Sequence, residues 1–309
     1  YPIQSIVTTT ILIDHHPACP AAGGRGYYGT TETVTTYKRE TTKTMAAENG
    51  SCTINDNGSA GNLIEYQGGY NTSNNTQDGE TFLDHEGLSN ADFGILQFAN
   101  KSYNKINRIS GCRSFRGFYL KDGSSFNNLT IGTACANGFA ALSVMYNGTG
   151  NNTITINHIV NNGAFDVAMI GLVVNNTFTF INMNSTYNNI GIYTETQPYN
   201  NYFTITNACN NGSTAFYFVL GTSNNIFDVS NIKNNGGYGF YAFGSNNIMK
   251  NAVFATNTTA DIYTGAGAKT YLYNCDLQNT SSEVTFTNDF SNTRVYSYKH
   301  DQTANLSKI

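Results

Sequence analysis

The chain has 309 residues and a formal net charge of −4, and only 12% of its side chains are charged. Phosphate neutralisation requires a basic face, and no Lys/Arg cluster is present, so these values argue against a nucleic-acid partner. No apolar run approaches the roughly 18 residues that a membrane-spanning helix needs. Abundant Asn, Gly, Thr, Tyr and Phe disfavour helix interiors and suit strands and turns, so the composition predicts an all-β protein.

Residues 1–61 differ in pattern from the rest of the chain and combine a Pro/Gly-rich loop with Thr-rich segments. They lack the basic and apolar segments of a signal peptide, so we expect that a leader was removed or that the chain is an internal piece of a longer protein. We expect this region to cap a repeat array, because an uncovered end would present unpaired strand edges. His15 and His16 beside Asp14 have metal-ligand chemistry, but an ordinary loop is the preferred interpretation.

The segment 76–88, TQDGETFLDHEGL, concentrates titratable groups that the following region avoids. Two carboxylates can act as general acid and as base or nucleophile on a glycan, and carboxylates with loop carbonyls can also bind Ca²⁺. The candidate catalytic residues are Asp78, Glu80, Asp84, His85 and Glu86, with Glu65 and Tyr66 lining the site. The preferred alternative is a solvated polar loop whose acids cap turns. Apart from Ca²⁺ no cofactor is predicted, and the absence of a CxxC pair argues against zinc.

Asn-Asn pairs recur in two sets, with steps of 22 to 25 residues in the first and of 27, 22 and 24 residues in the second. One set begins at residues 127, 151, 175, 200, 224 and 246, and a second set lies between them at 161, 188, 210 and 234. Apolar residues two apart, such as Phe178 and Phe180, follow the strand period within each unit. Such short strands cannot enclose a core alone, but stacked copies can. The repeat therefore predicts a solenoid with one unit per coil and neighbouring coils about 4.8 Å apart.

The asparagine pairs are expected at the corners of the coils. Asparagine tolerates the left-handed backbone of a tight turn, and its side chains can stack and hydrogen-bond along the axis when equivalent corners lie in register. Gly163, Gly212 and Gly236 follow the second set of pairs and are expected to have positive φ.

This pattern resembles the right-handed parallel β-helix repeat of pectate-lyase-like proteins, their periplasmic copper-loading relatives and phage tailspikes. The resemblance covers roughly 62–291 and is clearest over 104–270. It implies an all-β, right-handed parallel β-helix of nine or ten coils of 22–25 residues, behind a cap at 1–61 and before a C-terminal extension or linker at 292–309. This fold hosts lyases, hydrolases, epimerases, adhesins and virion fibres, so it does not choose among functions.

The candidate segment also resembles an arrangement common in extracellular β-helix proteins, E-Y…Y-N…D-G-x-x-F-x-x-D…G. Here it is carried by Glu65-Tyr66, Tyr70-Asn71, Asp78-Gly79, Phe82 and Asp84. The match assigns no catalytic role to these residues.

Cys112 and Cys135 occupy equivalent places in neighbouring coils, each eight residues after the first asparagine of its coil, Asn104 or Asn127. Stacked neighbours lie within disulfide reach. The alternatives are a bridge between coils and a ladder of reduced thiols facing the core, and the ladder is the preferred interpretation.

Three aromatic segments align across coils: GFYL (117–120), AFYFVLG (215–221) and GYGFYAFG (237–244). Strand alternation sends half of these rings into the core and leaves the other half outside. The outward rings would form a strip along the solenoid that suits sugar rings. Tyr119, Tyr217 and Tyr241 are therefore further candidate substrate-binding residues.

Two functional classes agree with these features. The first is an extracellular or surface-exposed protein that binds polysaccharide and, if two candidate acids converge, cleaves it as a hydrolase or lyase. The second is a non-catalytic structural or recognition fibre, such as a phage tail spike or fibre or a cell-surface filament or adhesin, assembled as a homo-oligomeric trimer or filament. Both place the protein outside the cell, on the cell surface or on a virion. The N-x-S/T sequons suit such a location but exceed chance only modestly.

Overall fold

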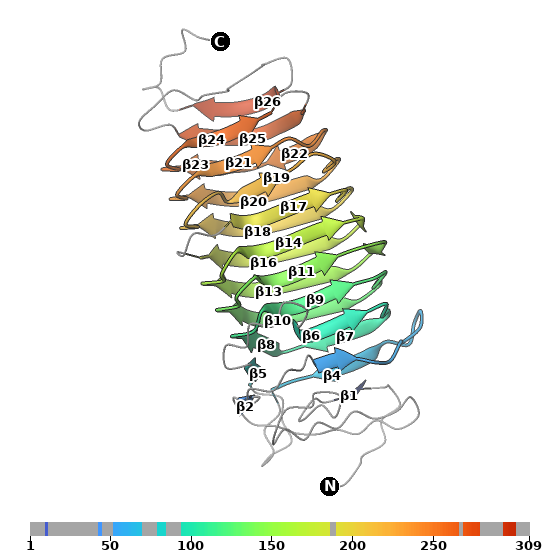
Figure 1. Cartoon of the computed structure of the whole chain (residues 1–309). Helices are drawn as coiled ribbons and strands as arrows, with labels where there is room; N and C mark the ends of the chain where they lie inside the picture. The colour runs from blue at the N-terminus through green and yellow to red at the C-terminus, as the bar shows by residue number, and fades with distance from the viewer. Residues whose placement is uncertain are drawn as a thin grey trace.

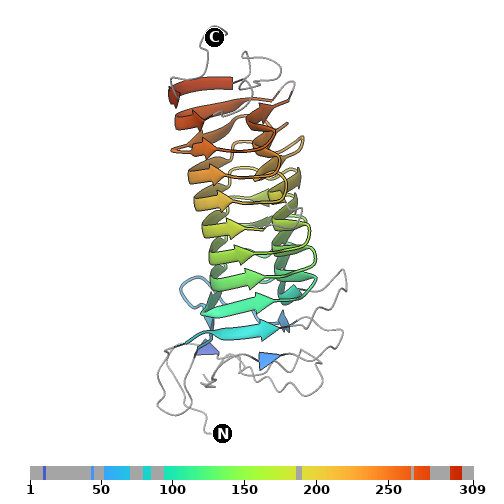
Figure 2. The ribbon, with the colours of Figure 1, turned by 90° about the vertical axis from the view of Figure 1, so that its left-hand side faces the viewer.

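The described residues of this computed structural model are 10–11, 43–44, 52–69, 79–84, 94–185, 190–265, 268–278 and 293–300. All regular structure within them is β-strand, and the strands stack in parallel as a β-solenoid (Figure 1). The colour gradient follows the stack from one end to the other, so each turn of the chain lies on the preceding turn (Figures 1 and 2). This confirms the predicted all-β parallel solenoid.

The nine-stranded sheet contributes one strand to each coil. In stacking order it contains β3 (Cys52–Ile54), β6 (Gly94–Ala99), β9 (Arg116–Lys121), β11 (Ala140–Met145), β14 (Phe165–Gly171), β17 (Ile190–Thr196), β19 (Phe216–Phe218), β21 (Tyr238–Ala242) and β24 (Ala260–Thr264). From the first of these nine strands to the last the chain makes about eight turns, where nine or ten coils were expected.

The fifteen-stranded sheet forms the rest of the wall. It contains β1 (Thr10–Ile11), β2 (Lys43–Thr44), β4 (Ile64–Gln67), β5 (Thr81–Asp84), β7 (Asn104–Asn107), β8 (Ile109–Cys112), β10 (Asn128–Cys135), β13 (Thr153–Val160), β16 (Thr177–Asn184), β18 (Tyr202–Cys209), β20 (Ile226–Lys233), β22 (Asn247–Lys250), β23 (Val253–Ala255), β25 (Thr270–Gln278) and β26 (Thr293–His300). A third sheet pairs β12 (Thr149–Gly150) with β15 (Val173–Val174). Because β3 pairs in parallel with β6, and β26 with β25, the stack reaches beyond 62–291 at both ends.

The core is a set of columns that run along the solenoid axis. Phe178, Phe203 and Phe227 lie in register on β16, β18 and β20, are fully buried, and stack with ring centroids 4.8 and 4.6 Å apart. Burial of one such side chain contributes about 1.5–3 kcal/mol. The inward positions are the alternating apolar ones that the strand period predicts. The described part of the chain contains no helix of the length and apolarity that crossing a membrane requires.

The two asparagines of a corner have different roles. The first adopts the left-handed backbone, with φ between 54° and 58° at Asn151, Asn161, Asn175, Asn200, Asn210, Asn224, Asn234 and Asn246. The second is buried, and its side chain hydrogen-bonds the next coil. The backbone N–H and the Nδ2 of Asn152, for example, both donate to Asn176 Oδ1 at 3.0 Å. The predicted stacking of amides at the corners is therefore present.

Two such ladders run along the solenoid. The first joins Asn104, Asn127, Asn152, Asn176, Asn201, Asn225 and Asn247. The second contains Asn137, Asn162, Ser185, Asn211, Asn235 and Asn257. Ser185, not the predicted pair at 188, takes the ladder position of its coil, and 188–189 lie outside the described residues.

The glycines after the second set of pairs do not carry the expected positive φ, because the first asparagine already makes the left-handed turn. They are needed for close approach instead. A Cβ added to Gly163 would clash with the backbone oxygen of Gly138, and one added to Gly236 would clash with that of Gly212. Coil spacing therefore leaves no room for a side chain at these two positions.

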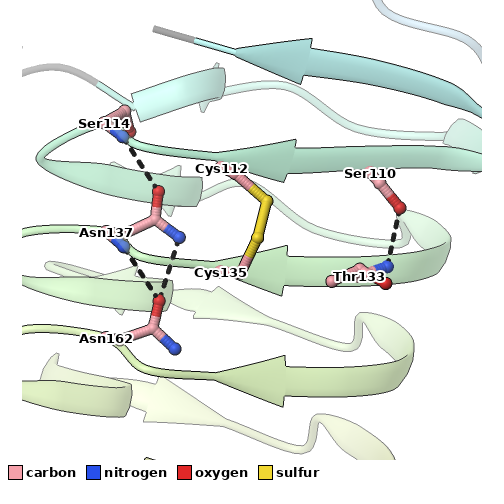
Figure 3. The surroundings of a disulfide bond; sticks show 7 residues. All are labelled: Ser110, Cys112, Ser114, Thr133, Cys135, Asn137 and Asn162. Carbon is pink, nitrogen blue, oxygen red and sulfur yellow. Dashed lines mark hydrogen bonds between the residues drawn. A yellow bond between two sulfur atoms is a disulfide. The ribbon is translucent and has the colours of Figure 1, made fainter. Parts of the chain in front are cut away.

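Cys112 and Cys135 form a disulfide between neighbouring coils, with their Cα atoms 4.6 Å apart (Figure 3). The preferred expectation of a core-facing thiol ladder was wrong. Ala134, which precedes Cys135, points into the core, so alternation places the bridged pair on the outer side of the sheet. Figure 3 shows the start of the second ladder beside the bridge, where Ser114 N–H donates to Asn137 Oδ1.

Candidate functional site

The outer face of the nine-stranded sheet carries four tyrosines on four consecutive coils. This tyrosine row consists of Tyr193, Tyr217, Tyr241 and Tyr263, which lie opposite one another on β17, β19, β21 and β24. Successive ring centroids are 5.9, 4.8 and 4.5 Å apart, with interplanar angles of 20°, 7° and 10°. All four side chains are half-buried. The row therefore forms a narrow aromatic surface parallel to the solenoid axis.

The outward direction of the row follows from the strand period. The residue before each tyrosine, Ile192, Phe216, Phe240 or Ile262, is at most 1% exposed and lies in the core. Because successive side chains in a strand point to opposite faces, the tyrosines must point outward. The same alternation on stacked coils keeps the four rings in line.

The row presents ring edges and hydroxyls to solvent, because the ring faces cover one another. The Tyr193 hydroxyl donates to Glu195 Oε2 at 3.1 Å. Burial, together with neighbouring Glu195 at Tyr193 and Tyr217 at Tyr241, raises the pKa of both phenols. Both hydroxyls therefore stay protonated near neutral pH; that of Tyr193 donates to Glu195, and that of Tyr241 can donate to a ligand.

Two further rings widen the row near its C-terminal end. Tyr238 and Phe243 lie 4.9 and 5.2 Å from Tyr241, with interplanar angles of 52° and 72°. The Phe243 ring occupies the space that a side chain at Gly265 would fill on the next coil. The surface at β21 and β24 is thus a compact aromatic patch.

Toward the N-terminal end the row continues into an apolar layer. Phe165 stacks on Tyr193 with centroids 4.5 Å apart, and Phe139 contacts Phe165 edge-on at 5.1 Å. The Arg116 guanidinium lies over Tyr119 and Phe139, 4.7 and 4.9 Å from their ring centroids. Phe139 and Phe165 are half-buried, like the tyrosines of the row, whereas Tyr119 and Arg116 are buried.

The candidate substrate-binding residues are distributed over three environments. Tyr217 and Tyr241 belong to the tyrosine row. Tyr119 shares their register position but is 2% exposed, and burial raises the pKa of its hydroxyl. Tyr66 is 1% exposed and lies in the core, and Glu65 forms an ion pair with Lys105 Nζ at 2.7 Å. The row does not include Glu65, Tyr66 or Tyr119.

The candidate catalytic acids are largely outside the described residues. Asp78, His85 and Glu86 are not described, and of Asp84 only the backbone, in β5, is described. Glu80 is half-buried, and its carboxylate occupies the space that a side chain at Gly132 in β10 would fill. Glu80 thus packs against the fifteen-stranded sheet, whereas the tyrosine row lies on the nine-stranded sheet. The catalytic assignment of these residues stays a prediction.

Metal binding has no described cluster to support it. Among the residues that the structure describes, no group of three or more His, Cys, Asp or Glu side chains could hold a metal ion. The Ca²⁺ alternative depends mainly on acids of the 76–88 segment that are not described.

Sequence reasoning found two residues of the row and missed the other two. Tyr193 and Tyr263 both lie in an Ile-Tyr-Thr triplet, at 192–194 and 262–264. Tyr263 lies 16 residues after its ladder asparagine, Asn247, as Tyr217 and Tyr241 lie after Asn201 and Asn225, so an alignment of coils on these asparagines would have found it. Tyr193 lies 17 residues after Asn176, and the same alignment would have missed it by one position. Comparisons with family models, curated proteins and solved structures found no match to this chain.

Proposed function

We propose that this protein is a surface-exposed or extracellular solenoid that binds polysaccharide along the outer face of its nine-stranded sheet. The observation that supports this most directly is the tyrosine row, four half-buried rings stacked on consecutive coils. Tyrosine offers apolar contact area and a hydroxyl with few rotatable bonds, so little conformational entropy is lost on binding.

The geometry favours an extended ligand that lies parallel to the solenoid axis. The row runs along that axis, with one hydroxyl on each coil at roughly the 4.8 Å spacing of strands in a sheet. A polysaccharide supplies hydroxyls in a similar repeating line, so the tyrosine hydroxyls can exchange hydrogen bonds with successive sugar units. The low overall charge and the carboxylate of Glu195, which accepts a hydrogen bond from the row, favour a neutral glycan over a polyanion.

The disulfide supports the proposed location. Disulfides persist in oxidising environments such as the cell exterior and the virion surface. The Cys112–Cys135 bridge lies on the outer side of its sheet, with Cys135 half-buried and Cys112 buried. We propose binding without cleavage for the tyrosine row, because hydrolysis would need acids that the row does not bring together.

The proposal is tested by affinity electrophoresis and calorimetry against a panel of neutral and acidic polysaccharides. Tyr217→Ala and Tyr241→Ala should each weaken binding about tenfold or more, because each removes a ring and a hydroxyl. Tyr217→Phe keeps the stack but loses a hydrogen bond of about 0.5–1.5 kcal/mol, so it should weaken binding about 2- to 12-fold.

Tyr202→Ala is the matched control, because Tyr202 is a half-buried tyrosine on the other sheet. Its binding should equal that of the unmodified protein, and circular dichroism should show every variant folded. Two results would overturn the proposal: no polysaccharide bound in the panel, or row variants that change only the oligomeric state measured by light scattering. The latter result would assign the row to contacts between copies of a fibre.

A further inference from the structure

The second asparagine ladder is interrupted at Ser185. In a regular step the Asn137 Nδ2 donates to the Asn162 Oδ1 at 3.0 Å. In the next coil Ser185 replaces the asparagine, and its Oγ accepts the Asn162 backbone N–H at 3.3 Å. The Asn162 Nδ2 turns instead to Asp166 Oδ1, at 3.1 Å. Asp166 therefore takes the acceptor role that the next asparagine plays elsewhere.

The interruption leaves two buried oxygens without a hydrogen-bond partner. Ser185 Oγ donates to Asp166 Oδ1, and Asp166 Oδ2 has no partner. On the other side of the break, Asn211 Oδ1 also has none, because a serine has no amide group to donate to it. A buried acceptor without a donor destabilises a fold. The weak point of the ladder is thus the coil of Ser185 and its contacts with the coils on either side.

In coils where the ladder is regular, the residue that matches Asp166 has a small side chain or none. It lies four residues after the ladder asparagine, and the matching residues in regular coils are Ala141, Ala215 and Gly239. The same position is acidic at the last described step of the ladder, where Asn257 Nδ2 donates to Asp261 Oδ1 at 2.8 Å. In both cases the aspartate lies beside a ladder asparagine, Asn162 or Asn257, for which no asparagine is described at the ladder position of the next coil.

Nothing described around Asp166 compensates a negative charge. The side chain is fully buried, and burial raises its pKa to about 7, although donation from Ser185 and Asn162 opposes the shift. The neighbouring strands β11 and β16 contain no charged residue. The titratable groups of β13 and β17, His158, Tyr193 and Glu195, lie on the outer faces of their sheets.

We propose that Asp166 and Ser185 form a proton-sensitive joint in the solenoid. With a neutral carboxyl group the coils on both sides stay in contact at this corner. With an ionised one, an uncompensated buried charge favours local opening of the chain between Asn162 and Asn211. The stack is then tightest under acidic conditions and loosens progressively at this coil as the pH rises toward neutral.

The sign follows from the folded-state pKa, which is about 7 where the ordinary value is 3.8. The stabilisation from Asp166 is fully present below the ordinary value. It declines as the pH rises and is lost above about pH 7, because the open chain ionises more readily than the closed one.

Hydrogen exchange followed by mass spectrometry tests the joint, with protection factors corrected for the intrinsic pH dependence of exchange. Between pH 5.5 and 8 the opening equilibrium of peptides that span 162–191 should rise about tenfold or more in the unmodified protein. Peptides that span 127–137 should not respond. Asp166→Asn keeps the shape of the side chain without its charge and should abolish the response.

Asp228→Asn is the matched control, because Asp228 is a half-buried carboxylate that accepts from Asn251 Nδ2 at 2.8 Å on the outer face. It should respond to pH as the unmodified protein does. The double variant D166A/S185N restores the regular ladder, with an amide for Asn162 and Asn211, and should be protected and insensitive to pH. A pH response that persists in both Asp166 variants overturns the proposal, as does its absence from the unmodified protein.

Discussion

Each corner of the solenoid divides two asparagines between a backbone role and a side-chain role. Asn175 supplies the left-handed turn, with φ at 54°, while Asn176 is 1% exposed and joins the coils before and after it. The division also accounts for part of the sequon excess. A corner pair followed by the first, outward threonine of a strand, as in Asn175-Asn176-Thr177, is an N-x-T sequence by construction. Such sequons reflect the architecture and do not by themselves indicate glycosylation.

The two roles predict unequal effects of substitution. Asn176→Ala removes the acceptor for Asn152 N–H and Nδ2 and the donor to Asn201 Oδ1, so we expect a loss of about 2–4 kcal/mol of unfolding free energy. Asn175→Gly keeps a residue that accepts positive φ and should change stability by less than about 1 kcal/mol. Urea denaturation of both variants measures the difference. Equal losses would show that the ladder contributes little beyond the turn.

At the scale of strands and coils, the two sheets carry different chemistry on their outer faces. The nine-stranded sheet carries the tyrosine row. The fifteen-stranded sheet carries a surface amide chain, in which Asn231 Nδ2 donates to Asn207 Oδ1 at 3.0 Å and Asn207 Nδ2 donates to Asn182 Oδ1 at 2.9 Å. Both patterns arise because one residue type recurs at one register position. Outward residues at one register position therefore form a column along the solenoid. A ligand on the outer face would contact several residues of one column.

The disulfide joins two adjacent coils across a sequence separation of 23 residues. Closing a loop of this length in the unfolded chain stabilises the native state by about 3 kcal/mol. Cys112→Ala/Cys135→Ala should lower the stability by about that amount, and mild reduction of the unmodified protein should match it. Cys209→Ala, which removes an unbridged thiol, is the control. Thermal melts with and without reductant measure the effect, and identical midpoints would contradict it.

At the scale of the molecule, each described coil contacts chiefly the coils next to it, as in other solenoids. The register of strands, ladders and rings repeats at each turn. The register of the strands is therefore a more stringent requirement than the number of turns. Stability should be close to a sum of coil and neighbour terms, with the break at Ser185 as its weakest interface.

Removal of one whole coil tests this view. Deletion of 200–223 brings Asn224 and Asn225 to the places of Asn200 and Asn201 and should leave a folded rod shorter by about 4.8 Å. Deletion of the single residue Thr204, in the middle of β18, should impair packing, because a one-residue slip within the strand turns core side chains outward. Circular dichroism and small-angle scattering compare the two. If both fold equally well, register is not what holds the stack together.

The solenoid, the inward columns and the corner positions could be predicted from the sequence. Phe178 and Phe180 show why, because their spacing of two and their recurrence on each coil are local patterns that need no knowledge of distant contacts. The candidate site was predicted less well. Tyr217 and Tyr241 were found by alignment of coils, whereas Tyr66 and Tyr119 proved to be buried. Sequence spacing predicts on which face of the sheet a ring lies, but it does not predict which neighbouring side chains bury that ring.

The amino-acid sequence by itself determined the coil length, the alternation of core and surface, and the left-handed corners, because each depends on residues close together in the chain. The tertiary structure alone decided the Cys112–Cys135 bridge, the covering of Tyr119 by Arg116, and the capture of the Asn162 amide by Asp166. These outcomes depend on which side chains of adjacent coils come into contact. Such contacts are defined only when the coils are stacked in register.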